Sequence, residues 1–361
     1  MKPLACSLLL LVLMFPQPCF SQSKAPEIHF DLMDVDSKAS FRGLSVVNDS
    51  TVWASGSQAT VVNTADGGKT WKITAIAKAG ETEFRDIEAF DTEKAFILGA
   101  GSPAYVFRTT DGNKSWRLNY SNQHPKIFFD AFAFWNSDAG IGFSDPIDQK
   151  LVIIRQYAGG KRLWQDKSID FPKMYKNEAG FAASGTCLTI YGNQNVWIGL
   201  GGQPEKGESP NARVLASPDR GLSWTISEST IPRSASAGIF SLVFLTEKYG
   251  VAVGGDYKDP EKASDNISIT EDGGKTWRKP TGKFPAGFRS CITAQNVNGI
   301  GYVLVATGTN GTDISTDKGE SWFPASKTGF HAITFSPDQK ASGWASGAAG
   351  RIARFKVNVP K

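Results

Sequence analysis

The sequence predicts an all-β fold, a seven-bladed β-propeller of four-stranded antiparallel blades, and three observations support it. A Trp-terminated octapeptide occurs five times along the 361 residues. Each copy follows apolar runs that have the length and alternation of β-strands. The two ends of the chain hold complementary parts of one further unit. A repeat of about 45 residues that carries four strands is typical of a propeller blade.

The octapeptides read TADGGKTW, TTDGNKSW, SPDRGLSW, TEDGGKTW and STDKGESW, and they match the Asp-box of sialidase-like propellers. The residue types suit a tight hairpin. The Asp carboxylate can accept backbone N–H groups of the turn, Gly supplies a positive φ, and Trp packs under the loop. We therefore assign a structural role to Asp66, Trp71, Asp111, Trp116, Asp219, Trp224, Asp272, Trp277, Asp317 and Trp322.

The spacing of the boxes predicts one hidden unit. The interval from Trp116 to Trp224 is about twice the others, and a degraded box, RQYAGGKRLW, ends inside it at Trp164. Two strand-like runs precede each box, such as FRGLSVV and TVWAS, so the box falls between the third and fourth strands of a unit. The six predicted blades are 41–76, 84–120, 128–168, 184–228, 238–280 and 288–325.

The seventh blade is predicted from the two ends of the propeller. Residues 329–358 supply three strands without a fourth, and residues 28–35 supply one strand without the other three. Joining them closes the ring and hides edges that would otherwise be open to aggregation. The alternative is a six-bladed ring with a ragged tail. In either case residues 22–361 form a single domain, which we expect to be a monomer.

Residues 1–21 have the pattern of a secretory signal peptide, because Lys2 precedes the apolar run LACSLLLLVLMF and then a polar turn. The run is too short to span a bilayer, and lipidation at Cys19 is the alternative. We expect an exported protein, periplasmic or extracellular, without a membrane span. Cys187 and Cys291 then remain. They lie near the starts of non-adjacent blades, so we expect free, buried thiols.

The antiparallel strands place the Asp-boxes on one face, called the bottom, and the loops between second and third strands on the other, called the top. These loops read as long and polar in the third, fourth and fifth blades, where they carry Asp145, Asp148 and Asp256. Loops on a rigid ring often bind ligands. The alternative is that they are solvated connections.

A second repeat points to the top face. Phe is followed by a basic residue at the start of the first strand in four blades that are neighbours in the closed ring, at Arg42, Arg85, Arg289 and His331. Such an arc would suit a carboxylate, a phosphate or an acidic protein segment. The alternative is that each pairs with a local acid, such as Asp86 or Asp130, and ties blades together.

With its Asp-boxes and the segments GFSDP, AGFAASGT, SAGIFSLVF, GGDY and GFHA, the chain resembles the bacterial relatives of the photosystem II stability and assembly factor, the Ycf48-like family. The resemblance covers nearly the whole chain after residue 21. It implies an exported, non-catalytic propeller that serves as a protein-binding or assembly platform, with an arginine-rich contact surface.

A glycan-active enzyme or lectin using the same face is the alternative function. Sialidases hold a substrate carboxylate with three arginines, which Arg42, Arg85 and Arg289 would imitate, but their FRIP motif reads FRGL here. A two-carboxylate glycosidase would use acids such as Asp86, Asp130, Asp145 or Asp256. We assign no catalytic residue. The three His residues lack zinc spacing, no cofactor or metal is expected, and a net charge of +4 disfavours nucleic acid as a partner.

Overall fold

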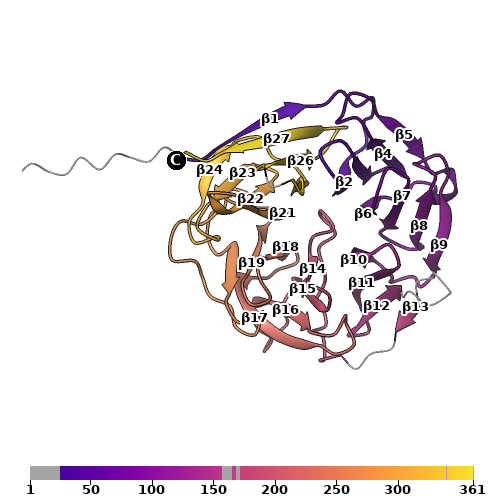
Figure 1. The fold of residues 1–361 in the computed structure, drawn as a ribbon. Coiled ribbons are helices and arrows are strands. Elements are labelled where there is room, and N and C mark those ends of the chain that lie inside the picture. Colours follow the sequence, from indigo (N-terminus) through magenta and orange to yellow (C-terminus); the bar gives the residue numbers. More distant parts are fainter. Residues whose placement is uncertain (1–24, 157–164, 168–170, 339, 361) are drawn as a thin grey trace, which may run out of the picture.

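The computed structural model describes residues 25–156, 165–167, 171–338 and 340–360. Over these residues seven antiparallel sheets are arranged in a ring (Figure 1). The predicted seven-bladed propeller is therefore confirmed, and the six-bladed alternative is wrong. The proposed signal peptide and most of the degraded box that ends at Trp164 lie outside the described residues. Within them, no helix has the length and apolar character needed to cross a membrane.

In each blade the first strand is innermost and the last is outermost (Figure 1). Blade 1 contains β2 (Phe41–Val46), β3 (Val52–Gly56), β4 (Thr60–Thr64) and β5 (Lys72–Ala75). Blade 2 contains β6 (Phe84–Ala89), β7 (Lys94–Gly99), β8 (Ala104–Thr110) and β9 (Arg117–Asn122), after a 3-10 turn at Ala77–Ala79. Blade 3 contains β10 (Phe129–Asn136), β11 (Ala139–Ile147), β12 (Lys150–Gln156) and β13 (Gln165–Lys167).

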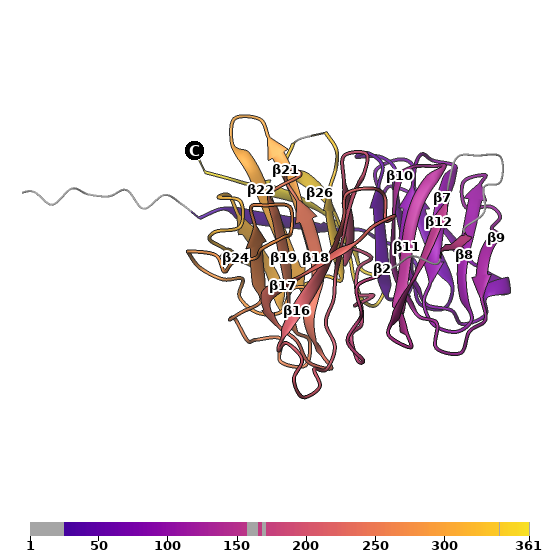
Figure 2. The ribbon, with the colours of Figure 1, turned by 90° about the horizontal axis from the view of Figure 1, so that it is seen from below.

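The remaining blades repeat this order, and their strands run between the two faces of the ring (Figure 2). Blade 4 contains β14 (Leu188–Tyr191), β15 (Asn195–Gly199), β16 (Asn211–Ser217) and β17 (Thr225–Pro232). Blade 5 contains β18 (Ala237–Phe244), β19 (Gly250–Asp256) and β20 (Ile267–Thr270). Blade 6 contains β21 (Cys291–Val297), β22 (Gly301–Gly308), β23 (Gly311–Ser315) and β24 (Phe323–Ser326). Blade 7 contains β25 (Ala332–Phe335), β26 (Ser342–Ser346), β27 (Ile352–Asn358) and β1 (Glu27–Leu32).

Blade 5 departs from the four-stranded pattern. Its outermost position is reduced to one bridge between Ile269 and Arg278. Pro280 follows two residues later and has no N–H to donate to a ladder. The chain then turns toward blade 6, where the side chain of Glu320 accepts the N–H of Thr281 at 2.8 Å. The outer edge of blade 5 is therefore held by its neighbour.

The N-terminal strand closes the ring, as the complementary ends predicted. β1 pairs antiparallel with β27, with Phe30 opposite Phe355. The ring of Phe30 lies 4.8 Å from that of Phe330 and 6.2 Å from that of Phe355. Figure 1 shows β1 beside β27, although the two are more than 300 residues apart in the sequence. Closure therefore includes packing as well as backbone pairing.

The core consists of apolar layers between adjacent blades. One layer joins Trp53 of blade 1 edge-on to Trp116 of blade 2, with ring centroids 6.3 Å apart. Cys187 belongs to the layer between blades 3 and 4, and Cys291 to that between blades 6 and 7. Both cysteines are free and buried. The expectation of unpaired, buried thiols is therefore confirmed.

The Asp-box turns have the local chemistry that their residue types suggest. Asp66 accepts the N–H of Thr70 at 2.9 Å and its hydroxyl at 2.6 Å, and it also accepts the hydroxyl of Thr64. These hydrogen bonds, led by those from Thr70, lower the pKa of Asp66 to about 2. Four equivalent turns surround Asp111, Asp219, Asp272 and Asp317.

Boxes also bind the preceding blade. Lys72 Nζ and Thr74 Oγ1, on the outer strand of blade 1, each donate at 2.8 Å to carbonyls of the blade 2 box. Ser227 of blade 4 donates at 2.6 Å to the box carbonyl of Gly274 in blade 5. The boxes therefore form hairpins and connect neighbouring blades.

Replacing Phe30 tests the closure. We expect Phe30→Ala to lower the free energy of unfolding by about 2 kcal/mol, because Phe30 is partly buried and removal of a fully buried phenyl ring costs roughly 3 to 5 kcal/mol. Leu32→Ala, on the same strand but 66% exposed, is the control and should change it little. Denaturant unfolding measures both. Equal free energies of unfolding for the two variants would contradict the closure. A truncated protein without residues 22–36 that keeps the stability of the full chain would contradict it as well.

Candidate functional site

A pocket of about 360 Å³ lies at the top of the ring, where the first strands of the blades converge. Its residues come from six blades and from the connection between blades 3 and 4. One side is polar, with Arg42, Arg85 and His331, and the other is aromatic, with Phe181 and Phe240. We call this the mouth pocket. It brings together side chains that are almost 300 residues apart in the sequence.

A repeated backbone irregularity directs two of the arginines into the pocket. In blade 1 the ladder pairs Phe41 with Gly56 and then Gly43 with Ser55, so Arg42 is an extra, bulged residue. Arg85 is bulged in the same way in blade 2. A bulge turns its residue out of the regular alternation of a strand. Arg42 and Arg85 therefore line the mouth pocket, while the preceding phenylalanines are buried in the core.

The predicted third arginine does not join them. In blade 6, Cys291 pairs with Thr307, which precedes Gly308, so Ser290 stands where Arg42 stands in blade 1. Arg289 is shifted by one position and is 1% exposed. Its Nε donates to Asp313 Oδ2 at 2.5 Å. The assignment of Arg289 to the arc was wrong, because a shift of one residue along a strand reverses the side that a side chain faces.

The two mouth arginines share one acid that the sequence analysis did not consider. Arg42 Nε donates to one oxygen of Glu83 at 3.0 Å, and Arg85 Nη2 donates to the other at 2.6 Å. Burial alone would raise the pKa of Glu83, but the two guanidiniums hold it below its usual value. Burial and the nearby Arg85 lower the pKa of Arg42. Two guanidiniums face one carboxylate, so the cluster carries one net positive charge.

His331 lies at the equivalent position of blade 7 and lines the same pocket. Its Nε2 is 3.1 Å from Ser40 Oγ. Burial lowers its pKa to about 4, with further contributions from the charges of Arg42 and Arg351. The imidazole is therefore neutral at pH 7. It offers a hydrogen bond to a ligand, but not the positive charge that the predicted arc assumed.

The aromatic side of the pocket is continuous. Phe240 is the bulged residue of blade 5, and its ring stacks on Phe181 at 4.0 Å with an angle of 11°. Phe288 meets Phe240 edge-on at 4.7 Å. Tyr257, 46% exposed, lies at the rim. These rings offer an apolar surface opposite the arginines.

The segment Gly180–Ala183 forms one wall of the pocket. The main chain at Ala182 accepts from Arg85 Nη1 at 3.2 Å, and that at Ala183 from Arg42 Nη1 at 3.5 Å. Gly180 N–H donates to Asp145 Oδ1 at 2.8 Å. The sequence analysis missed this segment as a site element, and also Glu83 and Phe240. The repeated FR pairs and the AGFAASGT run were the available signals.

The predicted acidic residues do not gather in the pocket. Asp145 is partly buried and accepts the N–H of Gly180, Asp256 accepts the N–H of Lys258, and the exposed Asp148 contacts Lys126 at 3.0 Å. The blade 3 loop was also mispredicted. β11 extends to Ile147 and β12 begins at Lys150, so the turn between them is short. The connections of blades 4 and 5 are long, at 200–210 and 257–266.

The enzyme alternatives lack an accessible constellation in the described part of the chain. Only two of the three arginines of the proposed triad reach the mouth pocket. Asp86 and Asp130, considered as glycosidase carboxylates, are buried. Neither of them pairs with the mouth arginines, which bind Glu83. Among the described residues, no three His, Cys, Asp or Glu side chains are placed to hold a metal ion.

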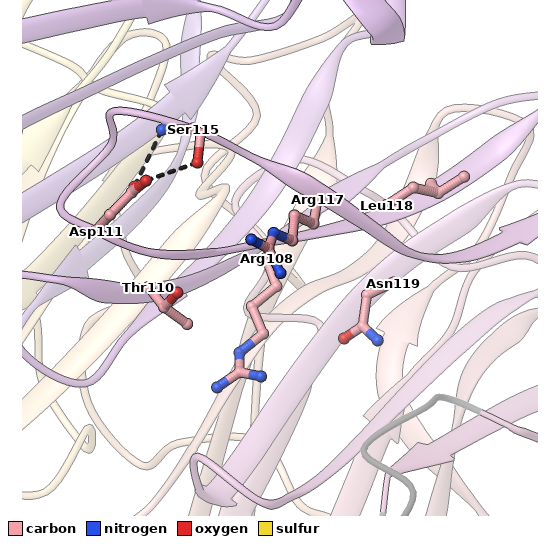
Figure 3. A pocket seen from close by; sticks show the side chains of 7 residues that line it. All are labelled: Arg108, Thr110, Asp111, Ser115, Arg117, Leu118 and Asn119. Carbon is pink, nitrogen blue, oxygen red and sulfur yellow. Dashed lines mark hydrogen bonds between the residues drawn. The ribbon is translucent and has the colours of Figure 1, made fainter.

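Another pocket, of about 320 Å³, lies on the outer part of blade 2. Figure 3 shows Arg108, Arg117 and Leu118 along its strands, and Asp111 with both hydrogen bonds from Ser115. Its side chains come from a single blade, and Asp111 is engaged in an Asp-box turn. The mouth pocket is the better candidate, because most of the ring contributes to it.

Single substitutions separate structural from recognition arginines. We expect Arg289→Gln to lower the free energy of unfolding by roughly 3 to 5 kcal/mol, because it leaves Asp313 buried without its cation. Arg42→Gln should lower it by about 1 kcal/mol or less, as for a solvent-accessible ion pair. Denaturant unfolding measures both. Equal losses would show that Arg42 is also a structural tie.

Comparison with known proteins supports the predicted resemblance. Residues 22–127 match the family described as photosynthesis system II assembly factor YCF48. No curated protein matches the sequence. Similar solved structures include YCF48 bound to D1 peptide, with 16% identity, a TM-score of 0.57 and coverage of 91% of this chain and 94% of that one.

Two further structures have the same fold. YCF48 from Cyanidioschyzon merolae has 16% identity, a TM-score of 0.57 and coverage of 91% of this chain and 98% of that one. The WD40 β-propeller domain of Doa1 has 9% identity, a TM-score of 0.56 and coverage of 91% and 97%. All three structures are below 25% identical to this chain, so they show a shared fold. The similarity to the YCF48 assembly-factor family, predicted from the Asp-boxes and the top-face segments, is thus confirmed, with the family match at residues 22–127 and the shared fold over most of the chain.

Proposed function

We propose that this chain is an exported, non-catalytic propeller that binds a peptide segment of a partner protein in the mouth pocket. The observation that carries the proposal is the convergence, at one opening, of two guanidiniums and a row of aromatic rings from separate blades. The resemblance to the YCF48 family supports it, since one YCF48 structure holds a D1 peptide. The apolar segment within residues 1–21 supports export, to the periplasm or the outside.

The two sides of the pocket define the ligand chemistry. Arg42 and Arg85 side chains are about a quarter exposed, at 26% and 25%. Their planar guanidiniums suit a carboxylate. Phe240 and Phe288 suit an aromatic or aliphatic side chain. The preferred segment therefore has a carboxylate next to an apolar side chain.

Glu83 sets the strength of this interaction. A ligand carboxylate must share or replace the hydrogen bonds that Glu83 makes to both arginines. A hydrogen bond to a charged group contributes roughly 1.5 to 3 kcal/mol, so loss of one arginine should weaken binding about tenfold or more. The loss should appear in affinity rather than in folding.

A peptide array tests the proposal. Fluorescently labelled protein is applied to decapeptides in which an aromatic residue is followed by an acid or by the matching amide. We expect the acidic set to be favoured. Anisotropy titrations with the peptides selected should show about tenfold weaker binding for Arg42→Gln and Arg85→Gln. The melting temperatures of both variants should stay close to that of the wild type.

Arg354→Gln is the matched control, because Arg354 is 42% exposed on β27 and does not line the mouth pocket. It should bind like the wild type. The proposal would be rejected if the protein showed no preference for the acidic set, or if the Arg42 and Arg85 variants bound the peptides as tightly as the wild type. Turnover of a sialoside that either arginine variant abolishes would favour a glycan-active enzyme instead.

A further inference from the structure

A buried acid lies directly under the wall of the mouth pocket. Asp130 is the bulged residue of blade 3, the position that Arg42 and Arg85 hold in blades 1 and 2. It is fully buried. Gly180 covers it so closely that a Cβ there would lie 2.5 Å from the Asp130 carboxyl carbon. The Gly180–Ala183 segment therefore sits directly on the carboxyl of Asp130.

Neither carboxyl oxygen of Asp130 receives a hydrogen bond from a donor among the described residues. Its polar neighbour is a second carboxyl, Asp145, which lies within hydrogen-bonding reach and also accepts the Gly180 N–H. Two ionised carboxylates in contact away from water would be strongly unfavourable. A proton on Asp130 removes the repulsion and provides an O–H that donates to Asp145. This arrangement therefore favours a shared proton.

The surroundings favour this protonated pair. Burial, followed by the charge of Asp145, raises the pKa of Asp130 well above its usual value, and burial raises the pKa of Asp145 to about 6. Arg85 opposes the shift of Asp130, but its guanidinium is already bound by Glu83. The other titratable groups nearby are Cys187, which is close to both Asp130 and Asp86, and Glu88, which is close to Asp86.

Those other groups are acids, so they carry no positive charge that could stabilise an ionised pair. Burial raises the pKa of Asp86 and of the Cys187 thiol well above their usual values, and burial raises that of Glu88 to about 7. Gly185, two residues beyond the segment, covers Asp86, since a Cβ there would lie 2.2 Å from its Oδ1. Residues 180–185 thus cover two buried acids from adjacent blades, with Gly180 over Asp130 and Gly185 over Asp86.

We propose that Asp130 and Asp145 form a proton-dependent latch that holds the Gly180–Ala183 segment over the channel and so controls the wall of the mouth pocket. With one proton shared, Asp145 keeps the Gly180 N–H and the segment stays closed. When that proton passes to water, two adjacent carboxylates remain and can be hydrated only if the segment lifts. Lifting also breaks the hydrogen bonds from Arg42 and Arg85 to its carbonyls.

The direction of the pH effect follows from the raised pKa values. The folded state binds more protons at this pair than the unfolded chain does, where an aspartate titrates near pH 4. The stabilisation from the pair is complete below about pH 4 and decreases as the pH rises through 6 and beyond. The latch is thus closed at acidic and neutral pH and opens on the alkaline side. Its effect on ligand binding rests on the proposed function, but the latch itself does not.

Hydrogen–deuterium exchange without any ligand tests the latch. From pH 6 to 9, after correction for intrinsic exchange, the amides of 180–183 should lose about tenfold or more of their protection in the wild type. Asp130→Asn should abolish this loss, because its amide donates permanently to Asp145. Its melting temperature should also fall less than that of the wild type over the same range.

Two further variants complete the design. Asp148→Asn alters an exposed acid of the same blade and should behave like the wild type. Asp145→Asn is the second test if Asp130→Asn fails to fold, because its amide can accept from Gly180 and donate to Asp130, and it should also abolish the loss. The latch would be overturned if the 180–183 amides of the folded variant lost as much protection between pH 6 and 9 as those of the wild type. It would also be overturned if the wild type lost protection over all seven blades. Peptide binding enters none of these readouts, so failure of the proposed function would not produce either result.

Discussion

Closure of the ring by β1 and β27 is the constraint on which the rest of the structure depends. Each blade buries its faces against its two neighbours, so an open ring would leave an apolar face at each end. The pairing of residues 27–32 with 353–358 completes the seventh sheet, and Phe30 adds aromatic packing to it. Because the ring is closed, all seven first strands surround one axis. Short loops at their starts can then meet in space.

The mouth pocket results from a small irregularity repeated on that closed ring. A bulge near the start of the first strand takes one residue out of the regular alternation of side chains between the two faces of the sheet. The type of this bulged residue differs from blade to blade. Arg42 and Arg85 make one side cationic, Asp130 is buried beside them, and Phe240 supplies the aromatic side. A symmetric scaffold thus carries an asymmetric site. The proposed function places binding specificity in these positions, whereas the Asp-boxes on the opposite face connect the blades.

The buried carboxyls distinguish this site from an ordinary surface pocket. Burying an acid without a donor is unfavourable, and Asp130 is buried in this way beneath Gly180. Asp86 is buried beneath Gly185 but accepts the N–H groups of Ile87 and Phe132. Glycine is required at both contacts, because any side chain there would overlap the acid beneath it. The segment is therefore closely fitted to its acids, and the same segment carries the carbonyls that Arg42 and Arg85 bind. The proposed recognition and the local stability therefore involve the same residues.

Much of the fold followed from local patterns. The composition of the Asp-box predicted a hairpin, and the spacing of the boxes predicted the blade length. The unpaired strands at the two ends predicted the closure. All three predictions depend on short-range chemistry and on the number of residues between repeats. The free state of Cys187 and Cys291 followed from that blade order. The site followed less well. The FR repeat indicated Arg42 and Arg85, which line the mouth pocket, but it also placed Arg289 beside them. Which acid binds the arginines, how Gly180 covers Asp130 and which side Arg289 faces depended on the register of the sheets and on contacts between distant blades. A shift of one residue in register leaves the local pattern intact and yet reverses the direction of a side chain, so the tertiary structure alone could decide these points.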